Sequence, residues 1–219
     1  EYKVMGLAPY GQPKHFERIM KEMVHLAPDG SFKLDMRYFD YDHGLRMTSE
    51  AFHEFFGGPP RTPESWMNER EFDIAASVQK VCEEVVLTMV RHLHQQTGLH
   101  NLCMAGGVAL NCVANGRIVR ETPFKNLFVQ PAAGDAGGGV GVAHWLYNTI
   151  EKQPRGAAWT NAYLGPGFSD EEIKAYLDGR GAKYQMLPRE ELLQKTARRL
   201  SEGNVIGWFQ GRMEFGPRA

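Results

Sequence analysis

Two short apolar segments between Leu102 and Ala143 each run into a glycine-rich turn, and no other part of the sequence restricts the possible folds as strongly. The first segment, Leu-Cys-Met-Ala, enters Gly106-Gly107, and the second, Leu-Phe-Val-Gln, leads to Gly134-Asp-Ala-Gly-Gly-Gly. A helical pattern follows each turn, an order that is typical of strand, helix and strand in a parallel sheet. Because such sheets bind ligands at the carboxyl ends of their strands, we expect a nucleotide and metal site there.

The glycines of these turns have a chemical and a structural interpretation. Without a Cβ, Gly106, Gly107, Gly137, Gly138 and Gly139 let their backbone N–H groups approach a phosphate closely, and the helices that follow add their positive ends. Tight turns need glycine as well, and neither cluster has the Walker or dinucleotide-binding spacing. From the spacing alone both interpretations stay open.

Two polar residues in these turns are candidates for function. Asp135 directly follows a predicted buried strand, where an uncompensated carboxylate is costly, so we expect a cation, a ligand hydroxyl or several N–H donors near it. Capping of the next helix would also satisfy Asp135. Asn111 stands at the beginning of the helix after Gly106-Gly107, and we expect it to cap that helix.

Four longer strings span nearly the whole chain: EYKVMGLAPYG from Glu1, AGGVALN from Ala105, QPAAGD from Gln130 and GWFQGRMEFGPR from Gly207. In this order they resemble the O-carbamoyltransferases of antibiotic and nodulation-factor biosynthesis. The resemblance implies an α/β chain that contains the second half of an actin/Hsp70-like (ribonuclease H-like) ATPase fold. The start of a threonylcarbamoyl-adenylate-synthase-like α/β domain is implied after it.

We expect residues 1–155 to belong to the carbamoyltransferase domain and residues 164–219 to begin the carbamoyl-adenylate-forming domain. Proline, glycine and small polar residues between Lys152 and Ala162 predict the connection, placed at residues 156–163. The chain opens on Glu1 without methionine and stops just after a Gly-Pro-Arg turn, so we expect an excised piece of a longer protein that is inactive alone.

The resemblance also implies an activity. Carbamoyl phosphate and ATP would give carbamoyl-adenylate in the second domain, and the first would pass the carbamoyl group to a hydroxyl of a small natural product or sugar. It implies that Asn111 contacts the nucleotide and that Asp135 binds a divalent metal ion, iron(II) or else manganese or zinc. The histidine pair expected to complete the metal site is not evident in this chain.

Arg212 and Arg218 flank a glycine-containing turn after a predicted buried strand at Asn204–Phe209. Because the planar guanidinium group matches phosphate oxygens, both are candidates for contact with carbamoyl phosphate or ATP. An ion pair with Glu214 is the structural alternative. The resemblance favours the functional interpretation.

Two other functions remain open from the sequence. One is a threonylcarbamoyl-transferase-like or sugar-kinase-like enzyme of the same fold, which would keep ATP binding but use another acceptor. The other is a non-catalytic structural fragment, whose exposed sheet edge would allow a homodimer.

Composition narrows the class of protein. The 219 residues are 42% hydrophobic, with no apolar run near the roughly 20 residues that a membrane helix needs, so we expect a soluble, cytoplasmic protein. A net charge of −1 with interspersed signs offers no field for nucleic acid or an anionic membrane. Cys82, Cys103 and Cys112 have no paired spacing and are expected to be reduced, buried thiols.

Local patterns predict the remaining elements. Helices are expected at residues 12–26, Glu69–Thr97 and Arg189–Glu202, with Gly98 ending the second and a further helix capped by Ser169. Residues 28–63 are rich in turn-forming and aromatic residues, which predicts short strands, a hairpin and a loop with most aromatic rings packed beneath it.

Overall fold

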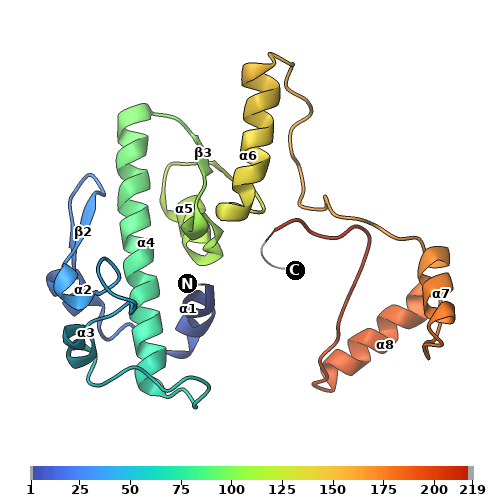
Figure 1. The fold of residues 1–219 in the computed structure, drawn as a ribbon, viewed down its shortest axis with the longest axis horizontal. Helices are drawn as coiled ribbons and strands as arrows, with labels where there is room; N and C mark the ends of the chain where they lie inside the picture. The colour runs from blue at the N-terminus through green and yellow to red at the C-terminus, as the bar shows by residue number, and fades with distance from the viewer. Residues whose placement is uncertain (1, 217–219) are drawn as a thin grey trace. The chain divides into compact units, whose positions relative to one another are not determined.

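The computed structural model describes residues 2–216, and these form two compact units. Unit 1 extends to Asp135 and unit 2 begins at Ala136. Each unit has its own helices and turns, and each is described separately below (Figure 1).

Unit 1 is built around helix α4, Glu69–Thr97. Asn68 and Glu71 form a reciprocal capping box at its start, which satisfies N–H groups that the first helical turn leaves without partners. Gly98 ends the helix in the left-handed conformation, with φ of +64°. The predicted helix and its glycine stop are confirmed.

One side of α4 carries α2 (Phe16–Glu22), α3 (Glu50–Phe55) and an antiparallel hairpin of β1 (Val24–Leu26) and β2 (Phe32–Leu34) (Figure 1). The helix predicted at residues 12–26 is therefore too long, because its last part pairs as β1. Within residues 28–63 the predicted hairpin begins earlier than expected and α3 was not foreseen. Ser49 caps α3 by accepting a hydrogen bond from the Phe52 N–H.

The aromatic residues of this region mostly pack inward, as predicted. Tyr38, from the short 3-10 helix η2 (Met36–Tyr38), is buried with Phe55 and Phe56. They pack with Ile19, Met23, Val24, Val81 and Val85 in one cluster. Tyr41 and Phe32 remain about half exposed. The region is thus held to α4 by a hydrophobic core.

The other side of α4 carries a parallel strand, helix and strand unit. Strand β3 (Asn101–Met104) leads through the 3-10 turn η3 (Gly107–Leu110) to α5 (Cys112–Glu121) and then β4 (Asn126–Val129). The strands pair in parallel with Leu102 opposite Leu127, which confirms the predicted arrangement. Their core cluster consists of Val86, Leu87, Val90, Leu102, Ile118 and Phe124.

The amino-terminal segment is also fixed to α4. Helix α1 (Tyr2–Leu7) continues into the 3-10 helix η1 (Ala8–Tyr10), and Gly11 follows it. The Asp73 carboxylate accepts the Gln12 N–H at 2.7 Å and pairs with the Lys14 ammonium at 2.7 Å. This bonding lowers the pKa of Asp73, chiefly through Lys14. A polar anchor therefore supplements the apolar contacts of the segment.

Unit 2 contains α6 (Gly138–His144), which continues as a π-helix at Trp145–Ile150, and helices α7 (Asp170–Gly179) and α8 (Arg189–Ser201). Ser169 and Glu172 form the capping box of α7, as the sequence predicted for Ser169. The expected connection at residues 156–163 lies in a stretch without helix or strand. The assignment of its flanks to two domains stays a prediction.

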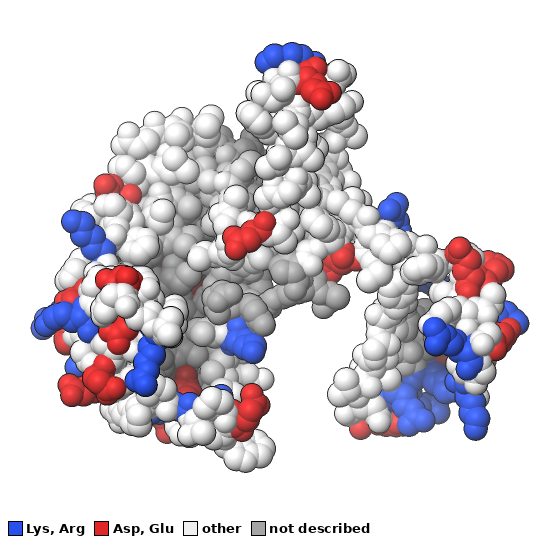
Figure 2. Space-filling model, in the orientation of Figure 1, with Lys and Arg blue, Asp and Glu red and all other residues white. Residues whose placement is uncertain are grey.

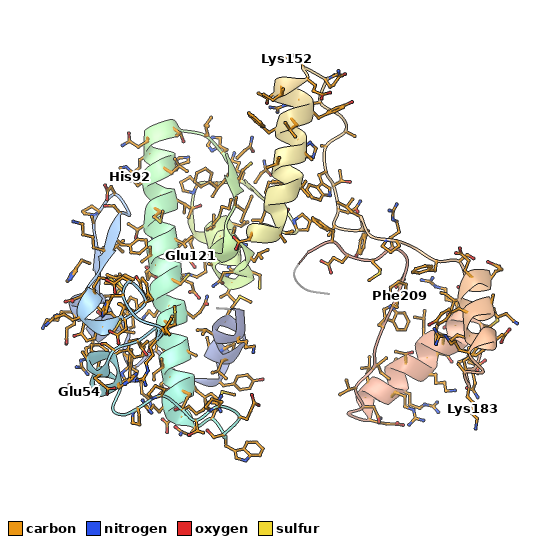
Figure 3. The ribbon with its side chains drawn as sticks, in the orientation of Figure 1. Glu54, His92, Glu121, Lys152, Lys183 and Phe209 are labelled. Atoms are coloured by element: carbon orange, nitrogen blue, oxygen red, sulfur yellow. The ribbon has the colours of Figure 1, made fainter. Side chains whose placement is uncertain are left out.

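The strand predicted at Asn204–Phe209 is absent from the described residues, and the prediction is wrong. The segment is extended but unpaired, with Val205 98% and Phe209 57% exposed (Figure 3). A strand exists only where a second strand accepts its hydrogen bonds. Pairing occurs further on instead, where Met213 N–H donates to the Pro166 carbonyl oxygen and Gly165 N–H to that of Met213, each at 2.9 Å.

Acidic and basic side chains are interspersed over the visible face of unit 1 (Figure 2). Cys82, Cys103 and Cys112 are free thiols, but Cys103 and Cys112 are exposed and Cys82 is only half-buried, so the predicted burial is wrong. Across residues 2–216, no helix combines the length and apolarity required to cross a membrane. The described helices and two-stranded sheets do not test the predicted actin/Hsp70-like fold or the domain predicted after it. Both stay predictions.

Candidate functional site

A hydrogen bond joins the two glycine turns of unit 1. The Gly106 N–H, just after β3, donates to the Ala133 carbonyl oxygen, after β4, at 2.8 Å. A Cβ placed on Gly134 would lie 3.8 Å from the Gly107 Cα, so the two backbones are adjacent. The two turns therefore lie side by side at the carboxyl ends of the parallel strands.

Backbone conformation explains why glycine is needed at Gly106 but not at Gly107 or Gly138. Gly106 has φ of +97° and ψ of 162°, a backbone conformation that side chains with a Cβ rarely adopt. A Cβ on Gly107 would meet no atom of the chain within 4 Å. The same is true of Gly138 in unit 2. Packing within the described chain therefore does not require glycine at Gly107 or Gly138.

The start of η3 offers unused hydrogen-bond donors. The N–H groups of Gly107 and Val108 have no acceptor among residues 2–216, as is usual at the first positions of a helical turn. Val108 is 54% exposed. An anion at this turn would thus find backbone donors and a residue without Cβ beside them.

Gly137 is buried and immediately precedes α6 in unit 2. It occupies the N-cap position of that helix with φ of −75°, an ordinary value. The backbone conformation therefore does not require glycine at this position.

Asn111 caps α5 as predicted. Its Oδ1 accepts the Ala114 N–H at 3.1 Å, and its Nδ2 donates to Gln79 Oε1 on α4 at 2.9 Å. Gln79 Nε2 returns a hydrogen bond to Asn111 Oδ1 at 3.1 Å. The amide is thus largely occupied by the protein, and contact with a nucleotide stays a prediction for Asn111.

Asp135 differs from its predicted environment. It begins the 3-10 turn η4 (Asp135–Gly137) and is exposed, so the expected cost of burying its carboxylate is not incurred. The prediction that the preceding strand is buried is wrong, because the residues of β4 are alternately exposed and half-buried. The chain is also half-buried at Gly134 and exposed at Asp135. Gly137, rather than Asp135, occupies the N-cap of α6. Within the described part of the chain the carboxylate has no hydrogen-bonding partner.

The described residues do not by themselves fit a metal ion. Residues 2–216 contain no group of three or more histidine, cysteine, aspartate or glutamate side chains placed to hold one. Asp135 offers a single exposed carboxylate. A metal role for Asp135 stays a prediction for the full-length protein.

Arg212 lies in unit 2, where its side chain braces the loop before α7. Its Nε donates to the Gly165 carbonyl oxygen at 2.8 Å and its Nη2 to that of Leu164 at 3.4 Å. The alternative interpretation, an ion pair of Arg212 with Glu214, is not found among the ion pairs of the described residues. Since these two bonds leave donors of the guanidinium free, phosphate binding stays open for Arg212. Arg218 lies outside the described residues.

The sequence analysis missed a polar network between α4 and α5. Arg117 Nη1 lies 2.9 Å from both Glu83 Oε2 and Glu84 Oε1, and its Nε and Nη2 bind the two oxygens of Glu121 at 2.8 Å. Figure 3 labels Glu121 at the end of α5. These bonds raise the pKa of Arg117 and lower that of Glu121, each chiefly through the other.

Gln79 connects this network to the candidate site. It is 7% exposed, and its Nε2 donates to Glu83 Oε1 at 2.7 Å as well as to Asn111. The i, i+4 spacing of Gln79 and Glu83 on a helix with an apolar face was the available signal. The buried amide of Gln79 thus links the residue that caps α5 to the ion-pair network around Arg117. This place in the network makes Gln79 a candidate for a positioning role.

Comparison with known proteins identifies the family. The family model described as "Carbamoyltransferase N-terminus" matches residues 1–144. An uncharacterised protein of Synechocystis is 52% identical over the whole chain, which spans 37% of that relative. Nodulation protein NolNO of Sinorhizobium fredii is 34% identical over the whole chain, which spans 31% of it.

A relative with an activity in its name is more distant. The 3'-hydroxymethylcephem-O-carbamoyltransferase of Streptomyces clavuligerus is 29% identical over 99% of the chain, which spans 37% of that relative. The chain thus spans about a third of the length of these curated relatives. The match over residues 1–144 covers most of the chain, including both glycine turns, and on this evidence the chain belongs to the carbamoyltransferase family.

Proposed function

We propose that this chain is part of an ATP-dependent O-carbamoyltransferase. In the proposed reaction carbamoyl phosphate and ATP give carbamoyl-adenylate, and the carbamoyl group then passes to a hydroxyl of a small natural product or sugar. The observation that carries the proposal is the joining of Gly106 and Ala133 at the ends of two parallel strands, within the segment that matches the family.

The acceptor class is supported by a relative. The cephem O-carbamoyltransferase, by its name, acts on a 3'-hydroxymethyl group, and the nodulation protein belongs to a different biological setting. We carry over only the shared chemistry, which is transfer to oxygen. The proposed acceptor is therefore a hydroxyl of a small molecule, with no role for nucleic acid or membrane.

Backbone groups supply the proposed phosphate contacts. Among residues 2–216 the N–H groups of Gly107 and Val108 have no acceptor, and a Cβ on Gly107 would stand in open space. Both features suit the close approach of an anionic oxygen. In unit 2, Gly137 caps α6 and Gly138 begins it, and Gly138 has the same open space. Preorganised N–H donors stabilise negative charge on a leaving phosphate without reorganising during the reaction.

Side chains supply the remaining proposed roles. The guanidinium of Arg212 has donors left for phosphate oxygens of carbamoyl phosphate or ATP, and Arg218 is proposed from the sequence alone. Asp135 is the proposed carboxylate ligand of a divalent metal ion, iron(II) or else manganese or zinc. Since the described residues offer Asp135 no companion ligands, the roles of the backbone donors and Arg212 are argued without the metal.

The experiment uses the full-length protein, ATP and carbamoyl phosphate labelled in its carbonyl carbon. Labelled carbamoyl-adenylate is expected first, followed by ATP-dependent transfer of label to a hydroxylated acceptor from a panel of cephem, aminoglycoside, macrolide and lipo-oligosaccharide compounds. Failure to form the adenylate and to label any acceptor would contradict the proposal. Phosphorylated acceptor in place of carbamoylated acceptor would indicate a kinase.

A further inference from the structure

The side chain of Asn111 fixes the orientation of the Gln79 amide, and the two form a hydrogen-bond network with Glu83. Its Oδ1 must face the Ala114 N–H to cap α5, which leaves Nδ2 to face Gln79. The Gln79 oxygen therefore points to Asn111 Nδ2 at 2.9 Å, and the Gln79 nitrogen lies between Asn111 Oδ1 and Glu83 Oε1. A flipped amide would place oxygen against oxygen and lose the cap.

At the other end of this network the carboxylate of Glu83 is held by a charged partner, Arg117. Glu83 accepts from Gln79 with one oxygen at 2.7 Å and from Arg117 with the other at 2.9 Å. Arg117 is itself bound by Glu84 and Glu121. The orientation of Gln79 is therefore set from both sides, by the helix cap and by an anchored carboxylate.

At the Asn111 end of the network, hydrogen bonds connect it to the glycine turn Gly106–Leu110. Asn111 N–H donates to the Val108 carbonyl oxygen at 2.9 Å, and Ala109 N–H donates to that of Gly106 at 3.0 Å. Asn115 Nδ2 also donates to the Ala109 carbonyl oxygen at 2.7 Å. Among residues 2–216 the N–H groups of Gly107 and Val108 have no acceptor. The turn that presents them is followed directly by Asn111, which is hydrogen-bonded to Gln79.

We infer that Gln79 is a positioning residue for nucleotide binding: by donating to Asn111 and Glu83 it holds the turn Gly106–Leu110 in the conformation that receives phosphate. This inference rests on the proposed function, because it assigns Gln79 to the same site. It acts through Asn111 and makes no contact with the nucleotide. Groups that bind ligands well are commonly held by neighbours whose own orientation is fixed.

The test replaces the donor by a group that donates only when protonated. In Gln79→Glu the new carboxylate faces the acceptor oxygens of Glu83 and Asn111, with Glu84 from α4 and Arg117 from α5 as the other charged groups of the network. Burial and the neighbouring carboxylates favour its neutral form, whose single O–H can donate to Glu83 while its other oxygen accepts from Asn111 Nδ2. Only the bond to Asn111 Oδ1, an atom that also accepts the Ala114 N–H, is then missing. Binding should therefore recover as the pH falls.

Calorimetric titration of the full-length protein with ATP and magnesium measures affinity and the fraction of competent protein separately. Relative to wild type at the same pH, Gln79→Glu should bind roughly five- to tenfold more weakly near pH 8 and within about twofold near pH 5.5. Gln79→Met, which donates at neither pH, should stay weak at both. The matched control Gln95→Glu, on the exposed end of α4, should follow wild type.

The outcomes separate the inference from the proposed function. Wild-type affinity in Gln79→Glu at both pH values, or a loss in Gln79→Glu that does not change with pH, would overturn the positioning role while leaving the proposed function intact. A reduced competent fraction with unchanged affinity would show only a folding defect and would also overturn it. Absence of ATP binding by the wild-type protein would overturn the proposed function and the positioning role with it.

Discussion

The Gly106 N–H donates to the Ala133 carbonyl oxygen at 2.8 Å, across the carboxyl ends of two parallel strands. The residues lie in the turns after β3 and β4, and α5 intervenes between them in the sequence. Their bond brings into contact the two motifs that the sequence singles out. The candidate site is thus a consequence of strand pairing between Asn101–Met104 and Asn126–Val129.

Gly106→Ala should destabilise unit 1. At φ of +97° and ψ of 162° an alanine is strained, at a cost of about 1–3 kcal/mol in the free energy of unfolding. Urea unfolding measures this cost. Gly107→Ala is the matched control, because its Cβ would meet no atom within 4 Å, and it should change stability little while weakening ATP binding. Equal stability losses in both variants would contradict this account of the turn.

Gly11→Ala should destabilise unit 1, because half-buried Gly11 lies against the backbone of α4. A Cβ there would lie 2.1 Å from the Phe72 carbonyl oxygen of α4, so the segment from α1 to α2 would have to shift. We expect a loss of about 1–3 kcal/mol in the free energy of unfolding, as for other overpacked sites. Gly6→Ala within α1, where a Cβ meets nothing within 4 Å, should be neutral or slightly stabilising. A Gly11→Ala variant as stable as Gly6→Ala would refute the close approach.

Arg117→Met should weaken the contact between α4 and α5. It leaves Glu83, Glu84 and Glu121 facing one another without their shared guanidinium. Because the Arg117 side chain is only 21% exposed, we expect a cost on the order of 1–3 kcal/mol in urea unfolding at neutral pH. Arg120 is exposed and lies about one helical turn after Arg117 on α5. Arg120→Met is therefore the control and should change stability little. An unaffected Arg117→Met variant would mean that the network is not stabilising.

Asp73 should make stability depend on pH. Hydrogen bonds from Lys14 and the Gln12 N–H lower its pKa from the ordinary 3.8, so its folded pKa lies below its unfolded pKa. Its contribution is therefore complete above about pH 4 and is lost as the pH falls through the folded value. The stability difference between wild type and Asp73→Asn should shrink in acid. Asp42→Asn, on an exposed loop, should run parallel to wild type across the same range, and a parallel Asp73→Asn curve would argue against the anchor.

The sequence predicted those elements whose signals are local. Helix α4 has apolar periodicity and ends at Gly98, and each of these signals acts over only a few residues of the sequence. Asn111 and Ser169 cap their helices for the same reason. Strands β3 and β4 were found because apolar runs between turn signals are short and bounded.

The failures involve partners that local patterns do not contain. Val24–Leu26 has a helical pattern in sequence but pairs with Phe32–Leu34, and Asn204–Phe209 has a strand pattern but no neighbour among the described residues. Asp135 was placed beside a buried strand, yet its exposure depends on how the turn leaves β4. Gln79 lies 32 residues from Asn111, so their pairing follows only from the packing of α4 on α5.

The most direct measurement compares the two half-reactions in full-length wild type, Asp135→Ala and Arg212→Ala. Carbamoyl-adenylate formation from ATP and carbamoyl phosphate is followed separately from transfer to a hydroxylated acceptor. We predict that Asp135→Ala still forms the adenylate but loses transfer, and that Arg212→Ala loses adenylate formation. Wild-type rates of both reactions in both variants would contradict the assignment of these residues to a carbamoyl-transfer site.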